Sequence, residues 1–263
     1  MTKNNFITLQ SWNTALYMYG NGDKPMNESS HINIFEKIKE YLNEENRIAV
    51  LQEIPYKTYT DVPNYHKKYG LHHSWIAFKN EFCEDEYDII MNPYNPDKKK
   101  DTVIKQTVIV AKKGLINKIE LKREDGNLFI PFNVTLGEQE NKKTFCILGV
   151  HAHDACELRE WLECRKDKIK PDIMIGDFNS GNYIKDKEDC KIAINRENYQ
   201  QLSTGYFDAV QGKYTTTYNT QIDHILIKNS KDFWDSFSVE NAKVEDGVKL
   251  SDHYPINCEI HCK

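Results

Sequence analysis

Short and almost continuous apolar runs recur along this sequence, and they constrain the fold more than any other feature. The clearest are IAVLQE at 48–53, FCILGVH at 145–151 and IMIGD at 173–177. Runs of this length are typical of strands that other elements cover on both faces. Helical patterns stand at 31–46, before the first of these runs, and at 155–169, between the last two. A chain that alternates such strands with amphipathic helices predicts a layered α/β domain.

The helix expected at 31–46 has an apolar stripe from Ile34 to Leu42, with Ser29 or Ser30 as its N-cap. Strands outnumber helices, and some are close enough along the chain to pair as antiparallel hairpins, which predicts mixed sheets. The other expected elements are strands at 6–13, 107–111, 128–134, 172–177, 222–228 and 253–260, turns around Gly114, Gly126 and Gly137, and a long surface loop at 83–102.

Composition bounds the domain organisation and the environment. The 263 residues show no internal repeat, so we expect one domain over 1–263. The net charge of −5 argues against a protein that coats nucleic acid by bulk charge, but not against a local basic groove. No signal-peptide core and no apolar run near ~18 residues is present. The seven cysteines lack a disulfide-scaffold or zinc spacing, which indicates reduced thiols in a cytoplasmic protein without stable membrane association.

Polar residues gather where the apolar segments end. In IMIGDFNSG, Asp177 and Asn179 are two positions apart, so in extended backbone both face one side while Phe178 turns to the core. Taken singly, each such residue fits an ordinary turn residue, surface acid or core imidazole. Their recurrence at nearly every strand end predicts a shared site. The candidate residues are Asn13, Glu53, His151, Asp177, Asn179, Asp223, Asp252 and His253.

This combination of side chains indicates one kind of chemistry. Carboxylate and amide oxygens without thiolates suit Mg²⁺ or Mn²⁺. Imidazoles move protons near neutral pH. Together they fit hydrolysis of a phosphate ester by in-line attack of water. The sequence has neither a GxxxxGK[ST] phosphate loop nor a GxSxG nucleophile motif, which argues against that class of nucleotide-driven enzymes and against serine hydrolases.

The order of these motifs resembles that of the endonuclease/exonuclease/phosphatase superfamily, over residues 13–255. The motif contexts are most similar to its deoxyribonuclease-like branch. The resemblance implies a four-layer α/β sandwich, in which two mixed β-sheets pack face to face between helices, with the site at one edge. The motifs that carry it are SWNT with Asn13, LQE with Glu53, GVHA with His151, GDFN with Asp177 and Asn179, IDHI with Asp223, and SDHYP with Asp252 and His253.

The resemblance also implies a metal site. Glu53 looks like the principal carboxylate ligand of a Mg²⁺ ion, for which Mn²⁺ can substitute. Asn13 looks like a second metal-site residue, and Asp252 like a further ligand or a water-mediated contact.

Catalytic roles are implied in the same way. His253 resembles the imidazole that contacts the scissile phosphate or activates water, with Asp223 as the carboxylate that orients it. Asp177 looks like the group that positions or deprotonates the attacking water, and Asn179 would bond that water or a phosphate oxygen. His151 resembles the second histidine, near the leaving oxygen. The residue that acts as the general base stays open.

The sequence favours a nuclease acting on DNA. Alternatives are a phosphatase or phosphodiesterase for a small-molecule or lipid phosphoester, sphingomyelinase-like or inositol-phosphatase-like, and an inactive binding module. The module is the weakest, because all eight positions are present. GVHAHD stands where repair-type members have a tyrosine-bearing segment, and His153 is taken as a rim residue. The lysines considered for phosphate contacts are Lys67–Lys68, Lys98–Lys100, Lys112–Lys113 and Lys142–Lys143.

Overall fold

The computed structural model describes residues 5–16, 28–56, 78–92, 104–122, 125–181 and 190–263. Within these ranges the chain forms two six-stranded mixed sheets. In spatial order the first holds β11 (Phe237–Val244), β12 (Ile256–Cys262), β1 (Phe6–Asn13), β2 (Arg47–Tyr56), β4 (Ile104–Lys112) and β3 (Tyr87–Ile90). The second holds β5 (Asn117–Lys118), β6 (Phe129–Leu136), β7 (Lys143–His151), β8 (Ile173–Asp177), β10 (Asp223–Lys228) and β9 (Tyr206–Asp208).

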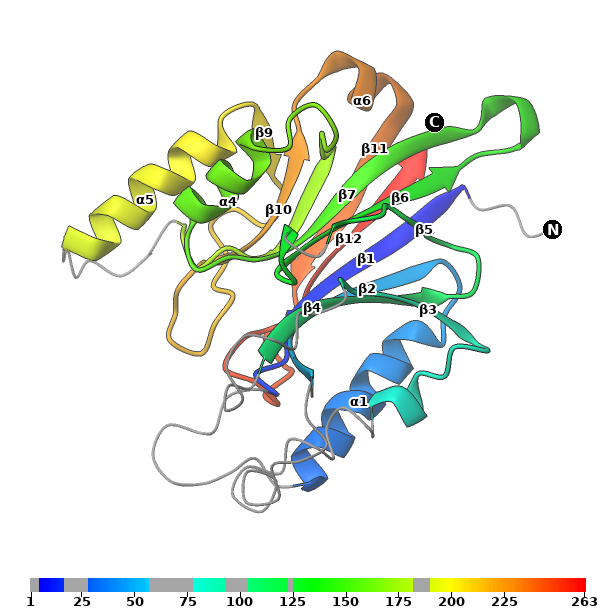
Figure 1. Ribbon diagram of the computed structural model, residues 1–263, viewed down its shortest axis with the longest axis horizontal. Coiled ribbons are helices and arrows are strands. Elements are labelled where there is room, and N and C mark those ends of the chain that lie inside the picture. The colour runs from blue at the N-terminus through cyan, green and yellow to red at the C-terminus, as the bar shows by residue number, and fades with distance from the viewer. Residues whose placement is uncertain (1–4, 17–27, 57–77, 93–103, 123–124, 182–189) are drawn as a thin grey trace.

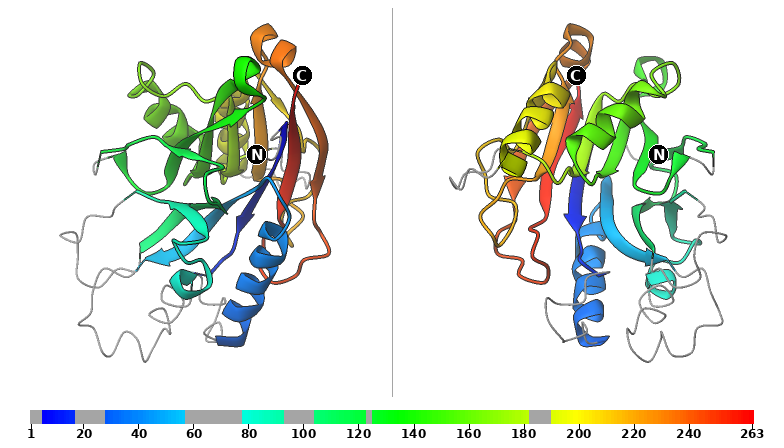
Figure 2. Two further views of the ribbon diagram at one scale, coloured as in Figure 1. Left: turned by 90° about the vertical axis from the view of Figure 1, so that its right-hand side faces the viewer. Right: turned by 60° about the vertical axis from the view of Figure 1, so that its left-hand side comes forward.

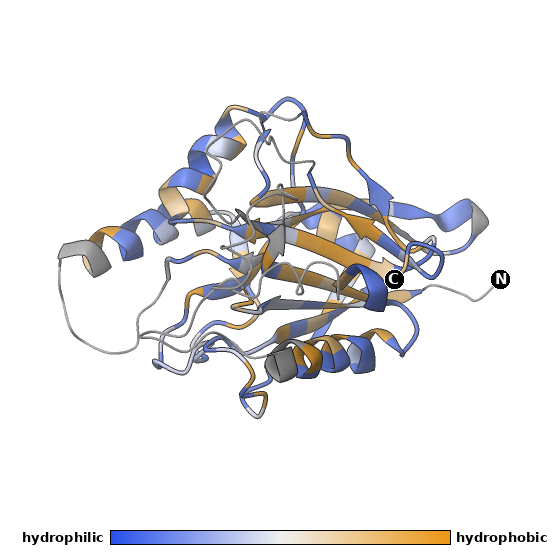
Figure 3. Cartoon of the chain, turned by 60° about the horizontal axis from the view of Figure 1, so that its bottom comes forward, coloured by the Kyte–Doolittle hydropathy of each residue, from blue (hydrophilic) through white to orange (hydrophobic). Residues whose placement is uncertain are grey.

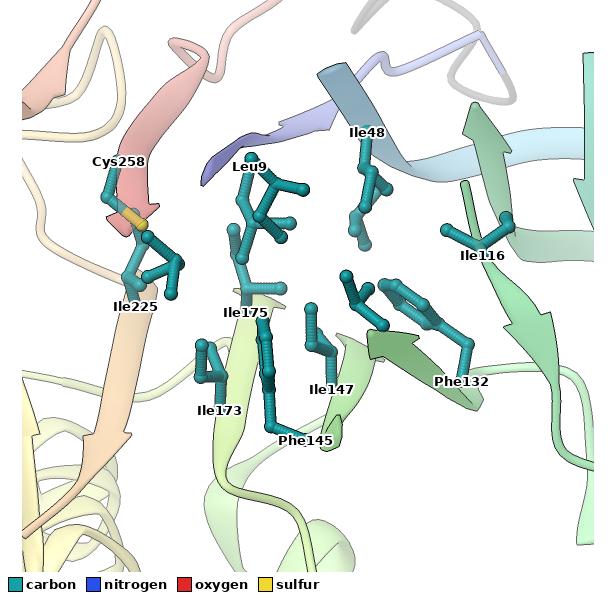
Figure 4. Close-up of a cluster of buried hydrophobic side chains, with 14 of the residues drawn as sticks. Leu9, Ile48, Ile116, Phe132, Phe145, Ile147, Ile173, Ile175, Ile225 and Cys258 are labelled. Carbon is teal, nitrogen blue, oxygen red and sulfur yellow. The ribbon is translucent and has the colours of Figure 1, made fainter. Parts of the chain in front are cut away.

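The two sheets pack face to face through alternate residues of their strands. Because successive strand residues project to opposite faces, every second apolar side chain enters this shared core. Figure 4 shows Leu9 and Ile48 of the first sheet opposite Ile147 and Ile175 of the second. All four side chains are fully buried. The near-continuous apolar runs therefore reflect strands that are buried on both faces, as the sequence predicts.

Helices cover the outer faces. α1 (Glu28–Leu42) packs on the first sheet, where its Phe35 and Ile38 join Leu51 and Val108 in a second core. α4 (Ala155–Glu163) and α5 (Cys190–Ser203) pack on the second sheet. Figures 1 and 2 show the order of the layers, with α1 on one side and α4 and α5 on the other. The predicted four-layer α/β sandwich is confirmed.

Figure 3 shows the hydropathy pattern behind these layers, with apolar strands inside and helices that present polar residues outward. No helix in the described ranges is both long and apolar enough to cross a membrane. A short helix, α6 (Lys231–Ser236), joins β10 to β11 and buries Phe233 against the shared core.

Several expected boundaries were wrong. α1 begins at Glu28, which places Ser29 and Ser30 inside the helix rather than at its N-cap, and it ends at Leu42 instead of residue 46. Asn46 has a φ of +60°, a left-handed conformation that cannot continue a helix. α4 stops at Glu163, well before residue 169.

The expected loop at 83–102 and the expected last strand at 253–260 also differ from the structure. β3 occupies residues 87–90 of the expected loop 83–102, whose residues 93–102 lie outside the described ranges. The last strand begins at Ile256 rather than at His253. Sequence patterns also gave no indication of α5, α6, β9 and β11, whose apolar positions are few or irregular.

Candidate active site

β7, β8 and β10 lie side by side and bring three predicted residues into one row. His151 ends β7, Asp177 ends β8 and Asp223 begins β10, and the register pairs His151 with Asp177 and Asp177 with Asp223. Since β10 runs antiparallel to β8, its start meets the ends of the other two strands. Gly176 allows this close packing: its φ is +149°, and a Cβ there would lie 2.0 Å from the Val150 carbonyl oxygen.

The first sheet contributes Asn13 and Glu53 to the same edge. Asn13 ends β1, and its Nδ2 donates to Asp177 Oδ2 at 2.9 Å, a bond between the two sheets. Glu53 lies in β2 where the pairing with β4 shifts register between Leu51 and Ile54, and its φ is +59°. A left-handed non-glycine residue costs about 1–2 kcal/mol. Such bulges re-aim side chains, and strain of this kind gathers at functional sites.

His253 reaches the row from the loop before β12. Its Nδ1 lies 2.9 Å from Asp223 Oδ2 and 3.1 Å from Oδ1, so the imidazole is held by the carboxylate. The loop is tied to β1, because Trp12 Nε1 donates to the His253 carbonyl at 3.1 Å and Ser251 Oγ donates to the Asn13 carbonyl at 2.8 Å. His253 Nε2 points toward Asp177, 3.9 Å from its Oδ2.

Burial and mutual charge shift the pKa values of this group. Burial raises the pKa of Asp177 to about 7, with help from the Asp223 charge and against the influence of His253 and of the Asn13 hydrogen bond. Burial alone would lower the pKa of His253, but the charges of Asp223 and Asp177 outweigh it and raise this pKa to about 10. The site thus holds a carboxyl of raised pKa beside an imidazole of raised pKa.

Asn179 turns back onto Asp177. Its backbone N–H donates to Asp177 Oδ1 at 2.8 Å, and its Nδ2 donates to the Ala152 carbonyl at 2.9 Å. Phe178 between them is fully buried in the core beneath α4 and α5. The predicted shared side of Asp177 and Asn179 is therefore observed. The reason differs from the extended geometry expected, because Asn179 has a φ of +47° and closes a tight turn.

Glu53 and His151 form a second acid–imidazole pair, with Glu53 Oε1 3.5 Å from His151 Nε2 and both side chains buried. Asp252 is half-buried beside His253. Its Oδ1 accepts from Ser251 Oγ at 3.4 Å and its carbonyl accepts from the Thr217 N–H at 2.8 Å. The structure thus joins five predicted residues in one network: Asn13, Asn179, Asp177, Asp223 and His253. The Glu53–His151 pair adjoins this network because His151 is paired with Asp177 between β7 and β8. Asp252 adjoins it because it directly precedes His253.

Two residues that support this network were not predicted. Thr215 Oγ1 accepts from the backbone N–H groups of Ile222 and Asp223 at 3.2 and 3.1 Å, which fixes the start of β10. Ser251 holds the His253 loop on β1 through the bond described above. Ser251 stands in the SDH motif and could have been included. Thr215 carries no sequence signal, because its partners follow it by seven and eight positions in an irregular segment.

The predicted lysine clusters that the structure describes lie away from this edge. Lys112 ends β4, which runs antiparallel to β2, so it lies beside the start of β2 and not beside Glu53. Lys143 begins β7, whose other end is His151. The clusters Lys67–Lys68 and Lys98–Lys100 lie outside the described residues. His153 is exposed just before the N-terminus of α4, as expected for a rim residue.

Two mixed sheets packed face to face between helices, with acids, amides and imidazoles at one edge, define a protein of the deoxyribonuclease I-like fold. Solved structures with this fold cover nearly the whole chain, which confirms the predicted resemblance at the level of the fold. No protein-family model matches the sequence, and no curated protein matches it.

Three of these structures show the extent of the likeness. AP endonuclease LMAP from Leishmania major is 12% identical, with 98% of this chain and 88% of that chain covered and a TM-score of 0.63. The Xenopus laevis APE2 catalytic domain is 14% identical over 98% and 92%, with a TM-score of 0.62. The 3'-5' exonuclease NExo from Neisseria meningitidis is 14% identical over 96% and 98%, with a TM-score of 0.55.

Proposed function

We propose that this protein is a divalent-metal-dependent phosphodiesterase that hydrolyses nucleic acid, with DNA as the favoured substrate, and that residues 1–263 form its catalytic domain. The observation that carries the proposal is the network of Asn13, Asp177, Asp223 and His253, which places a carboxyl of raised pKa beside a protonated imidazole at the edge of this sandwich. Such opposed pairs of titratable groups fit acid–base chemistry at neutral pH.

In this mechanism Asp177 accepts a proton from the attacking water, because a carboxyl with a pKa raised to about 7 is suited to proton transfer near neutral pH. Asn13 and Asn179 hold the carboxylate oxygens in place. His253, fixed by Asp223, donates from Nε2 to a phosphoryl oxygen. The water oxygen bonds to phosphorus as the ester bond opposite it breaks. We assign His151, held by Glu53, to the leaving oxygen.

The side chains present fit a divalent ion. Asp177, Asp223 and His253 have potential ligand atoms within 4.8 Å of one another. However, His253 Nδ1 already bonds Asp223, and Asp177 Oδ2 already accepts from Asn13 Nδ2. We assign the ion to the oxygens of Glu53, with Asn13 and Asp252, because this is a hard donor set that suits Mg²⁺ or Mn²⁺. When bound, the ion would stabilise negative charge on the phosphate.

The substrate proposal draws on proteins of the same fold. LMAP is named an AP endonuclease and NExo a 3'-5' exonuclease, NExo has been seen with a product DNA hairpin, and a Danio rerio TDP2 with a single strand DNA product. A small-molecule or lipid phosphoester is the second candidate. The observation that favours it is the position of the Lys112 and Lys143 clusters, remote from the site and unsuited to guiding DNA toward it.

A substrate panel separates the two candidates. Chelator-treated protein is given bis(p-nitrophenyl) phosphate, single-stranded and duplex DNA, RNA, sphingomyelin and inositol polyphosphate, each with no metal, Mg²⁺ or Mn²⁺. His253→Ala is the control for contaminating nuclease. We expect metal-dependent cleavage of DNA that His253→Ala loses. Turnover only of a lipid or inositol phosphate supports the second candidate. Cleavage in excess chelator, or none of any phosphoester, refutes the proposal.

A further inference from the structure

A second histidine–carboxylate pair lies behind the site, in the layer between the second sheet and α5. It consists of His224, the residue after Asp223 in β10, and Asp208 at the end of β9. Because successive strand residues face opposite sides, Asp223 points to the site while His224 points to the helical layer. His224 is fully buried, and its Nδ1 lies 2.8 Å from Asp208 Oδ2. The proposed reaction uses neither residue.

Asp208 is surrounded by donors. Tyr199 Oη donates to Oδ2 at 2.8 Å, Gln221 Nε2 donates to Oδ2 at 3.1 Å, and the Val210 N–H donates to Oδ1 at 3.1 Å. Together with His224 these make four partners, three at Oδ2 and one at Oδ1. The Tyr199 ring stacks on His224 with centroids 4.2 Å apart. Such a fully satisfied buried network fixes the orientation of the imidazole.

The other nitrogen of His224 is directed at the site loop. His224 Nε2 lies 2.9 Å from the carbonyl oxygen of Ser180, one residue after Asn179. A carbonyl oxygen only accepts, so His224 Nε2 is the donor in this bond. Gly181 permits the approach, because a Cβ there would lie 2.5 Å from His224 Nε2 and 2.2 Å from the Gln221 carbonyl oxygen.

Two further hydrogen bonds fix the same loop. The N–H of Ala155, the first residue of α4, donates to Ser180 Oγ at 2.9 Å, and the Phe178 N–H donates to the Ile222 carbonyl at 2.9 Å. His224 thus supplies the attachment on the β10 side, immediately next to the residue that holds His253. The adjacent residues Asp223 and His224 therefore bond to two different segments of the site: Asp223 to His253, and His224 to the loop that follows Asp177 and Asn179.

We propose that His224, oriented by Asp208, is a positioning residue for the reaction: it holds the Ser180 carbonyl and so keeps Asn179 and Asp177 in the geometry that the attacking water requires. The expected effect of His224 on turnover rests on the proposed function. The expected effect of His224 on the order of the loop does not.

Two variants divide the two hydrogen bonds of His224. The amide nitrogen of Asn reaches the position of imidazole Nδ1, and that of Gln the position of Nε2. His224→Asn keeps the bond to Asp208 and loses the bond to Ser180, whereas His224→Gln does the reverse. Tyr199→Phe is the matched control, since it removes a donor to Asp208 without touching the loop. Thermal unfolding, kcat and KM are measured for all three.

We expect kcat of His224→Asn to fall ~10- to 100-fold with KM little changed, as for other groups that orient site residues. His224→Gln should retain ~10-fold more turnover than His224→Asn even if it is less stable, and Tyr199→Phe should lose stability but not kcat. A kcat that follows the order of melting temperatures, or equal kcat in the Asn and Gln variants, would overturn the positioning role.

Two further measurements need no turnover. Amide hydrogen exchange of the segment 177–181 should be faster in His224→Asn than in His224→Gln, and equal rates would contradict the proposal. In the unmodified protein, ¹⁵N-histidine NMR should show a slowly exchanging Nε2–H proton for His224, and a ring without a proton on Nε2 would contradict it too. If the unmodified protein hydrolysed no phosphodiester, the proposed function would fail while these two results still decided the inference.

Discussion

Replacing Asp223 by Asn should shift the pH dependence of the reaction, because this carboxylate sets the protonation of His253. The Asp223 charge is the largest influence that raises the pKa of His253 from 6.5 to about 10. The burial that lowers this pKa persists in the variant, as does the Asp177 charge that raises it, so the pKa should fall well below 10. At pH 8 an imidazole of pKa 10 is ~99% protonated, and one of pKa 6.5 only ~3%.

The sign follows from the role of His253 as a donor. Activity needs the protonated imidazole, so it is lost as pH rises through the pKa of His253. In the unmodified protein the alkaline limb should lie near pH 10, and the rising limb near pH 7, where Asp177 ionises. In Asp223→Asn the alkaline limb should move from near pH 10 toward pH 6.5. The ratio of variant to unmodified kcat/KM should then fall between pH 6 and pH 8, by ~25-fold for a limb at pH 6.5.

The assay is hydrolysis of bis(p-nitrophenyl) phosphate from pH 5 to pH 10.5 at saturating Mg²⁺, with kcat/KM at each pH. This substrate has a low-pKa leaving group, so the profile reports the enzyme's own groups. His253→Ala is the control and should leave only the background rate at every pH. A ratio that stays constant from pH 6 to pH 8 would show that Asp223 does not set the protonation of His253, and would refute the electrostatic argument.

Two shorter predictions test the rest of the site. Glu53→Gln should behave like metal removal: Mg²⁺ affinity by calorimetry should fall ~10- to 100-fold with circular dichroism unchanged, and normal affinity would exclude Glu53 as the principal ligand. Lys142→Ala with Lys143→Ala should leave the salt dependence of duplex DNA cleavage unchanged, because β7 runs from Lys143 to the site at its opposite end; a slope reduced by about 0.9 per lysine would mean that DNA reaches that end.

Much of the fold could be predicted because apolar runs and helical stripes report burial directly. Strands 48–53 and 145–151 and the stripe of α1 are such cases. β11 could not be predicted, because most of its side chains are exposed or half-buried and its pattern has no clear period. α4 ended early because Arg165 binds Asp125, 40 positions away, and the turns around it replace the helical bonds. That contact has no local signal.

The residues of the candidate site also fall into those that the sequence could indicate and those that it could not. Residues at strand ends, such as Asp177 and Asp223, could be chosen from the sequence because strand ends converge at one edge. Asp208 and Thr215 could not, because their functions depend on pairings across β9 and β10 that only the folded sheet defines. His224 was overlooked for another reason: in IDHI it reads as a core residue, and its significance comes from partners at positions 180 and 208.

The arrangement of the site also links its chemistry to the packing of the sandwich. Asp177 belongs to the second sheet, yet one of its oxygens is held by Asn13 of the first. His253 belongs to a loop anchored on β1 of the first sheet, yet its carboxylate partner Asp223 begins a strand of the second. Both bonds, each of which contributes to a pKa shift of the site, therefore cross between the sheets. A change that shifts one sheet against the other should alter the pKa values of Asp177 and His253 before it unfolds either sheet.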